Sequence, residues 1–183
     1  MGVKLITNDF IFIHIPKTGG SSIERFFGQD HGLPGTPPAH HNVHWYMKNS
    51  SNFDQLYKFS FVRNPWDRYV SLYFYKRERF NYEESFTDFC KNAAEYVLEK
   101  PGHRRQVDML MINGEIAVDF VGKMENFQTD FDVVCRHLNI EETTLPHINQ
   151  TKHKPWQEYY NDESRKIIEE IYKEDIDYFG YEF

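Results

Sequence analysis

Two short apolar runs have the length and composition of buried β-strands, and each is followed at once by a helix start. Residues 10–15 read FIFIHI and lead into PKTGGSS, while residues 57–62 read YKFSFV and lead into RNPW. Runs of β-branched and aromatic residues that end at glycine or proline favour strands over helices. After the second run, Asn64 is a good N-cap and Pro65 suits the first helical position. The pattern therefore predicts the same strand-to-helix unit twice.

Apolar residues at helical spacing predict the helices of the chain. Ile23, Phe26 and Phe27 share one stripe of a helix that begins directly after the glycines. Ser85 with Asp88 resembles a capping box at the start of another helix. The same spacing predicts helices over 86–98, 127–138 and 161–179, and an apolar run predicts a third strand over 118–122.

Strands that alternate with helices imply a parallel sheet. The sequence therefore predicts an α/β fold of three layers, with a central parallel sheet flanked by helices. At 183 residues the chain fits one domain, and it contains no internal repeat or linker. We expect a single domain over 1–183.

The charge balance and the apolar runs exclude several partners. A formal net charge of −7 argues against general nucleic-acid binding. No run approaches the length that spans a bilayer, and the opening MGVKLITNDF lacks a secretory signal. We expect no membrane segment in the chain as given and a cytoplasmic location. Cys90 and Cys135 lie beside core-facing helix positions and are predicted to be reduced core residues.

The loop between the first strand and its helix has the composition of an anion site. Residues 19–22, GGSS, offer backbone N–H groups and two hydroxyls at a helix N-terminus, and Lys17 and Thr18 add a cation and a further donor. The Lys precedes the glycines, whereas in a Walker A loop it follows them. Taken alone, the loop is also compatible with a purely structural glycine turn.

The loop is part of a longer resemblance. FIFIHIPKTGGSSIE and the later FSFVRNPWDRYVSLYFY closely resemble the two cofactor motifs of the sulfotransferases that use 3′-phosphoadenosine 5′-phosphosulfate (PAPS), in the branch that includes carbohydrate sulfotransferases. The resemblance continues through VDFVGKMENFQTDF and LPHINQTKHKPWQEYYNDES to DIDYFGYEF, so it covers most of the chain. It implies a P-loop-like version of the α/β fold predicted above.

The resemblance also implies an activity and a set of site residues. It implies an O-sulfotransferase that moves a sulfonate group from PAPS to a hydroxyl of an acceptor, expected to be a carbohydrate, and releases 3′-phosphoadenosine 5′-phosphate (PAP), with no metal. In the family the first motif cradles the 5′-phosphosulfate and the second holds the 3′-phosphate through an Arg and a Ser. The residues of this chain that match these positions are Lys17, Thr18, Gly19, Gly20, Ser21, Ser22, Arg63 and Ser71.

Sulfonate transfer requires a base on the acceptor side and a cation on the leaving side. Lys17 is the candidate cation, because an ammonium neutralises charge that builds on the bridging oxygen. A histidine suits the base, and the family carries one at a position nearest His41, with His40 as the close alternative. Together with His31 and His44 these histidines could instead bind zinc, although no standard ligand spacing occurs, or they could be exposed loop residues.

Other charged residues leave two interpretations open. The segment from Arg104 to Gln106 could meet an acidic sugar or be solvated surface, and Lys152 and Lys154 could help hold the nucleotide or be surface lysines. Arg68 could contact phosphate or form an ion pair with Asp67 or Glu24.

Two functions compete with sulfonate transfer. One is a non-catalytic module that binds PAP or a glycan on the same fold. The other is a P-loop phosphotransferase, and two features speak against it. The Lys precedes the glycines, and no obvious magnesium-binding Asp ends a strand, since Asp119 lies inside one.

Overall fold

The structure is a computed structural model that describes residues 10–28, 40–141, 143–145 and 154–183. The chain divides into two compact units, each described below by itself. The first unit contains Met1–Val62 and Asp108–Asn149, and the second contains Arg63–Val107 and Gln150–Phe183. The expectation of a single domain over 1–183 stays a prediction.

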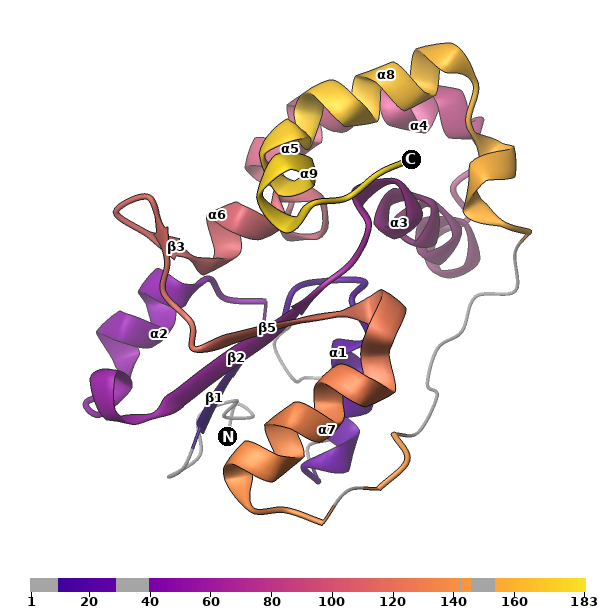
Figure 1. Ribbon diagram of the computed structural model, residues 1–183. Coiled ribbons are helices and arrows are strands. Elements are labelled where there is room, and N and C mark those ends of the chain that lie inside the picture. Colours follow the sequence, from indigo (N-terminus) through magenta and orange to yellow (C-terminus); the bar gives the residue numbers. More distant parts are fainter. Residues whose placement is uncertain (1–9, 29–39, 142, 146–153) are drawn as a thin grey trace. The chain divides into compact units, whose positions relative to one another are not determined.

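A parallel sheet forms the centre of the first unit (Figure 1). Its strands are β1 (Phe10–Ile13), β2 (Tyr57–Val62) and β5 (Phe120–Lys123), in the order β1-β2-β5. β2 pairs in parallel with both neighbours, with Phe12 opposite Phe59 and Phe61 opposite Gly122. The three predicted strands are thus confirmed, with ends that differ from the prediction by at most two residues. The α/β fold with a parallel sheet flanked by helices is confirmed.

Phenylalanines join the sheet to the two helices that cover one of its faces, α1 (Gly20–Phe26) and α7 (Phe127–Leu138). Alternate side chains of a strand point to the same face. On that face Phe61 lies 5.3 Å from Phe127 of α7 between ring centroids. Phe26 and Phe131 join α1 to α7 at 4.8 Å. The burial of these large aromatic rings stabilises the unit.

The first unit also contains elements that the sequence analysis did not predict. Helix α2 (Val43–Asn49) begins at Asn42, whose side chain accepts a hydrogen bond from the Trp45 N–H at 3.1 Å. A short hairpin consists of β3 (Met111–Ile112) and β4 (Glu115–Ile116). The remaining elements of this part are η1 (Phe53–Gln55), η3 (Met124–Asn126) and α6 (Gln106–Leu110), which crosses from the second unit into the first.

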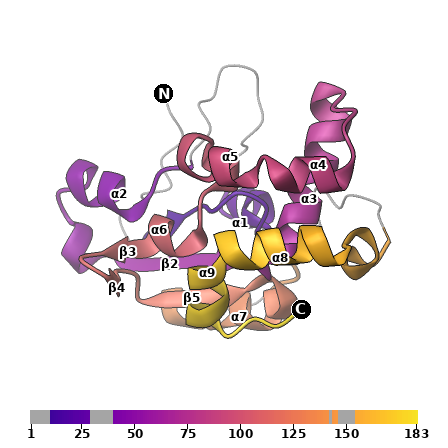
Figure 2. The same cartoon turned by 90° about the horizontal axis from the view of Figure 1, so that it is seen from above.

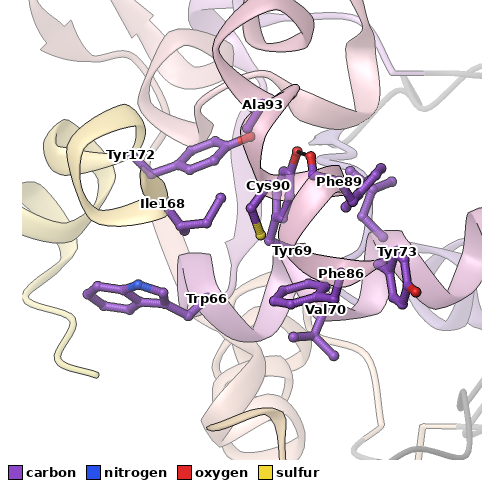
Figure 3. Close-up of a cluster of buried hydrophobic side chains, with 11 residues drawn as sticks. Trp66, Tyr69, Val70, Tyr73, Phe86, Phe89, Cys90, Ala93, Ile168 and Tyr172 are labelled. Atoms are coloured by element: carbon purple, nitrogen blue, oxygen red, sulfur yellow. Dashed lines mark hydrogen bonds between the residues drawn. The ribbon is translucent and has the colours of Figure 1, made fainter. Parts of the chain in front are cut away.

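Helices pack around one aromatic core in the second unit (Figure 3). The core is built on α3, whose start is the predicted one: Asn64 Oδ1 accepts the Trp66 N–H at 3.0 Å, and Pro65 is the first helical residue. Ser85 caps the next helix as predicted. The elements of this unit are α3 (Pro65–Phe80), α4 (Phe86–Lys91), α5 (Ala93–Glu99), η2 (Pro101–His103), η4 (Trp156–Tyr159), α8 (Asp162–Ile171) and α9 (Lys173–Phe179).

Two predicted helices are each divided into two. The helix over 86–98 ends at Lys91 and starts again at Ala93, and the helix over 161–179 bends at Tyr172 (Figure 2). Tyr172 is buried and its hydroxyl donates to the His103 carbonyl at 2.6 Å, so tertiary contacts hold this residue where the helix breaks. Spacing alone does not reveal such a break.

Both cysteines are buried free thiols, Cys90 in the second unit and Cys135 in the first, which confirms the prediction of reduced core residues. Among the described helices, none is long and apolar enough to cross a membrane.

Candidate active site

The loop from His14 to Gly19 links β1 to α1 and contains two left-handed residues. Lys17 has φ 69° and Gly19 has φ 80°. Left-handed residues that alternate with right-handed ones turn successive N–H groups toward one concave point, which is the geometry of an anion-binding nest. A positive φ is uncommon at a lysine.

The hydroxyl groups of the loop differ in their surroundings. Thr18 is fully buried and its Oγ1 donates to the Ile15 carbonyl at 2.8 Å, so the proton of this hydroxyl is already used within the loop. Ser22 is buried and its N–H donates to the Gly19 carbonyl at 2.9 Å, while Ser21 and Lys17 are half-buried. The residues predicted for the 5′ side of the cofactor therefore lie together in the end of the loop and the first turn of α1.

Close packing requires both glycines of the loop. A Cβ at Gly19 would lie 2.7 Å from Met124 Sδ and 2.7 Å from the Phe127 ring. A Cβ at Gly20 would lie 2.1 Å from Cδ2 of His14, so the imidazole occupies the space of a side chain there. The two glycines let the backbone approach its neighbours more closely than any other residue permits.

His14 forms a buried pair with Glu24 directly behind the loop. His14 follows the last residue of β1, Glu24 lies on α1, and His14 Nδ1 makes a short hydrogen bond with Glu24 Oε1. The carboxylate is 1% exposed, and its negative charge adds to burial in raising the pKa of Tyr46 well above its ordinary value. Sequence reasoning missed this pair and offered Glu24 only as a partner of Arg68.

The predicted base histidines lie in different environments. His40 Nδ1 lies 3.3 Å from the His14 carbonyl oxygen, and the two imidazoles meet edge to face with 4.5 Å between centroids. His41 stacks on Trp45 at 4.0 Å, and partial burial lowers the pKa of His41. His44 is exposed on α2, and His31 falls outside the described residues. Within the described ranges, no group of three or more His, Cys, Asp or Glu is arranged to hold a metal ion.

Arg63 belongs to the second unit, where its backbone and side chain are both held. Its guanidinium donates from Nε and Nη2 to the two carboxylate oxygens of Asp67, each at 2.8 Å. The Gln106 amide accepts the Arg63 N–H at 2.9 Å and donates to the Arg63 carbonyl at 2.9 Å. Ser71 is buried one helical turn beyond Asp67, on the same face of α3. The face that carries Ser71 therefore also carries the guanidinium.

Three basic residues that the sequence analysis considered have structural partners in the second unit. Arg68 is buried and donates to the Gly102 carbonyl at 3.1 Å, and Asp67 pairs with Arg63 instead. Arg105 forms an ion pair with Glu174. The Gln106 side chain is fully buried, which removes it from the surface that an acidic sugar would meet. Lys154 is exposed and pairs with Glu158 at 3.5 Å, and Lys152 falls outside the described residues.

Asp175, on α9, holds the backbone at Gln106, the residue that pairs with Arg63. Its two carboxylate oxygens accept the N–H groups of Gln106 and Val107, both at 2.9 Å, at the start of α6. Burial raises the pKa of Asp175, and the two backbone hydrogen bonds oppose that shift. Because Asp175 holds Gln106 and Gln106 holds Arg63, the sequence-distant Asp175 fixes a predicted cofactor residue. The sequence carries no local signal for either contact.

The predicted site residues thus fall into two groups. The loop from Lys17 to Ser22 and the histidines His40 and His41 belong to the first unit, and Arg63 and Ser71 to the second. Val62 ends β2 beside β1 in the parallel sheet, and Arg63 is the next residue of the chain. Convergence of the two groups on one nucleotide stays a prediction.

Comparisons with known proteins place the chain in a family. An uncharacterized protein of Archaeoglobus fulgidus is 32% identical over 109 residues, which are 57% of this chain and 88% of that protein. No solved structure matches the chain. The sequence model of the Sulfotransferase family matches residues 6–182, and the protein therefore belongs to the sulfotransferase family.

Proposed function

We propose that the protein is an O-sulfotransferase that takes the sulfonate group of PAPS and places it on a hydroxyl of a carbohydrate acceptor. One observation carries the proposal: the His14 imidazole packs on Gly20 of the loop and also against His40. His40, a histidine suited to act as a general base, therefore contacts the same His14 ring that packs on the loop proposed to bind the phosphosulfate. Membership of the sulfotransferase family supports the same chemistry.

The loop is proposed to hold the 5′-phosphosulfate. The left-handed residues Lys17 and Gly19 favour N–H groups that converge on an anion, and the glycines allow the close approach that a phosphate requires. The Lys17 ammonium is proposed to neutralise the charge that develops on the oxygen bridging phosphorus and sulfur.

The transfer is proposed as an in-line displacement. The acceptor oxygen attacks sulfur and its proton passes to a histidine nitrogen, while the bond from sulfur to the bridging oxygen breaks and its electron pair stays on PAP. The products are a sulfate ester, PAP and a proton that the histidine later releases to water. This scheme uses a base on one side of sulfur and Lys17 on the other.

Arg63 and Ser71 are proposed to bind the 3′-phosphate. Arg63 presents a guanidinium held by Asp67 on the face of α3 that carries Ser71. A guanidinium with a preset orientation loses less rotamer freedom when it binds phosphate. An Arg and a hydroxyl together provide the charge and the donors that a phosphate monoester binds.

A carbohydrate acceptor is supported by one exposed aromatic pair. Trp45 is 39% exposed and stacks with half-buried His41, directly after His40 in the chain. The apolar face of a sugar ring packs on such an aromatic surface while its hydroxyls stay solvated.

Thermal unfolding tests the nucleotide assignment. PAP should raise the melting temperature, whereas adenosine 5′-phosphosulfate, which lacks the 3′-phosphate, and ATP with Mg²⁺ should raise it little. A hundredfold excess of PAP over its dissociation constant stabilises the folded state by about 2.7 kcal/mol. A larger shift with ATP than with PAP would refute the proposal.

A transfer assay then separates the enzyme from its competitors. Labelled PAPS is incubated with a panel of mono-, di- and oligosaccharides, and transfer of the label to a sugar is the expected result. PAP binding with no transfer to any hydroxyl acceptor would favour the non-catalytic module. Asp119 was predicted inside the third strand, and this is wrong: it lies just before β5 and pairs with the Lys58 ammonium at 3.0 Å. An Asp held by a lysine at this end of the strand disfavours the phosphotransferase.

A further inference from the structure

The carboxylate of Glu24 is buried, although a glutamate on a helix normally faces solvent. It lies on α1 four residues after Gly20, yet it is 1% exposed, and His14 is 6% exposed. Moving a carboxylate out of water has a large free-energy cost unless a strong partner compensates it. The hydrogen bond to His14 Nδ1 is such a partner. A costly polar pair behind a predicted catalytic loop indicates a function beyond packing.

His14 connects Glu24 with His40 through two groups, its ring and its carbonyl. The carboxylate fixes the His14 ring, and that ring meets the His40 ring edge to face at 4.5 Å. The His14 carbonyl lies 3.3 Å from His40 Nδ1. A carbonyl oxygen can only accept, so this contact places the proton of neutral His40 on Nδ1 and makes Nε2 the acceptor nitrogen.

The charge of Glu24 suits a histidine that becomes positive during the reaction. When His40 takes a proton, a buried negative charge nearby stabilises the imidazolium, and low-dielectric surroundings strengthen this interaction. His41 lies flat on Trp45 instead and meets the Tyr46 ring edge to face at 6.5 Å, whereas His40 contacts His14, the hydrogen-bond partner of Glu24. The two neighbouring histidines therefore have different environments.

We infer that His40 is the base of the proposed transfer and that the buried pair of Glu24 and His14 are positioning residues for it. The acceptor hydroxyl gives its proton to Nε2 of His40 as its oxygen attacks sulfur. Glu24 holds the His14 ring, and His14 holds the orientation and tautomer of His40. The inference rests on the proposed function for the reaction, but the tautomer of His40 can be measured without turnover.

The kinetic test uses Glu24→Gln, which keeps the shape of the side chain and removes its charge. Glu115→Gln is the matched control, because Glu115 is an exposed carboxylate in the same unit. Glu24→Gln should lower kcat about ten- to a hundredfold, as for partners that orient a functional histidine elsewhere, with the dissociation constant of PAP unchanged. Glu115→Gln should keep the wild-type kcat. His14→Asn retains a donor toward Glu24 without the ring, and it should lower kcat similarly.

Imidazole NMR gives a second measurement that does not depend on transfer. Long-range ¹H–¹⁵N spectra of the PAP-bound wild type should show His40 as a single tautomer with its proton on Nδ1. Glu24→Gln and His14→Asn should give mixed tautomers at His40, while Glu115→Gln should match the wild type. If the wild type binds PAP and transfers to no acceptor, the proposed function fails, and the spectra still decide whether the pair positions His40.

Three results would overturn the inference. One is a wild-type kcat in Glu24→Gln. Another is an unchanged single tautomer of His40 in both Glu24→Gln and His14→Asn. The third is a loss of kcat that is matched by an equal loss of PAP affinity and of melting temperature, because Glu24 would then only support the loop around Gly20.

Discussion

Gln106 pairs with the backbone of Arg63 as a neighbouring strand would. Its amide oxygen accepts the Arg63 N–H and its amide nitrogen donates to the Arg63 carbonyl, each at 2.9 Å across a sequence separation of 43 residues. Two hydrogen bonds to one residue leave its backbone little freedom to rotate. The direction in which the Arg63 guanidinium points is therefore set partly by a side chain far away in the sequence.

The pairing predicts that Gln106→Leu weakens PAP binding through Arg63, although Gln106 itself is not proposed to contact PAP. The variant leaves two backbone groups of Arg63 without their amide partner, which should lower the free energy of unfolding by about 1–3 kcal/mol. Titration calorimetry should show PAP affinity reduced about tenfold, which corresponds to about 1.4 kcal/mol of binding free energy. Gln157→Leu, at an exposed glutamine of the same unit, is the control. Wild-type PAP affinity in Gln106→Leu would contradict the proposed role of Arg63.

Replacing Arg63 by Ala should mainly affect PAP binding, and replacing Lys17 by Ala should mainly affect kcat. Arg63→Ala should raise the dissociation constant of PAP, because the guanidinium is proposed to bind phosphate in both ground and transition states. Lys17→Ala should lower kcat more than PAP affinity, because its charge is matched to bond cleavage. Calorimetry and steady-state rates separate the two effects. Equal loss of affinity in both variants, with kcat preserved, would remove Lys17 from catalysis.

Gly20→Ala should damage both the loop and the fold. The new Cβ would lie 2.1 Å from the His14 ring, and the buried pair with Glu24 prevents that ring from moving away. Urea unfolding should show a loss of about 3 kcal/mol, at the upper end of overpacking effects. Gly28→Ala is the control: its φ is 70°, and nothing lies within 4 Å of a Cβ there, so it should lose about 1–2 kcal/mol. Equal losses would contradict the packing argument.

The two base candidates should separate under saturating PAPS. His40→Ala should reduce kcat by roughly a hundred- to ten-thousandfold, the range for loss of a general base. His41→Ala should mainly raise the KM for the acceptor, because the ring stacks on exposed Trp45. The sequence resemblance placed the base nearest His41. A larger loss of kcat in His41→Ala would restore that assignment.

His103 should make stability depend on pH. Burial, with nearby Lys76, lowers its pKa from 6.5 to about 3. Below pH 6.5 the unfolded chain binds a proton that the folded protein does not, so stability is full above 6.5 and falls as the pH drops toward 3. From pH 7.5 to 5 the wild type should lose about 2 kcal/mol more than His103→Asn in urea unfolding. The same pH dependence in both proteins would contradict this account.

Local patterns were sufficient for most of the secondary structure. The strands β1, β2 and β5 follow from runs of β-branched and aromatic residues, and the start of α3 follows from Asn64 and Pro65. These features depend on residues close together in the sequence, which is why spacing reveals them. The motif residues from Lys17 to Ser22 likewise follow from sequence pattern alone, and their binding of PAPS stays a prediction.

Helix α2 shows where local patterns fail. It has seven residues, of which only Val43 and Tyr46 are buried, so it leaves a weak periodic signal. The break at Tyr172 is also invisible to spacing, because a hydrogen bond from its hydroxyl to His103 fixes it. Short elements and breaks are set by packing against residues distant in the sequence.

By itself, the sequence determined the α/β class, the three parallel strands, the capped helix starts and the motifs that mark the family. Only the tertiary structure decided which polar residues meet. Glu24 stands between Ile23 and Arg25 on a short helix, and nothing nearby in the sequence indicates that its carboxylate is buried against His14. Gln106 likewise resembles a solvated residue after two arginines until the fold brings it to Arg63. Partners of buried polar groups come from other elements of the fold, so they depend on tertiary packing, which local spacing does not encode.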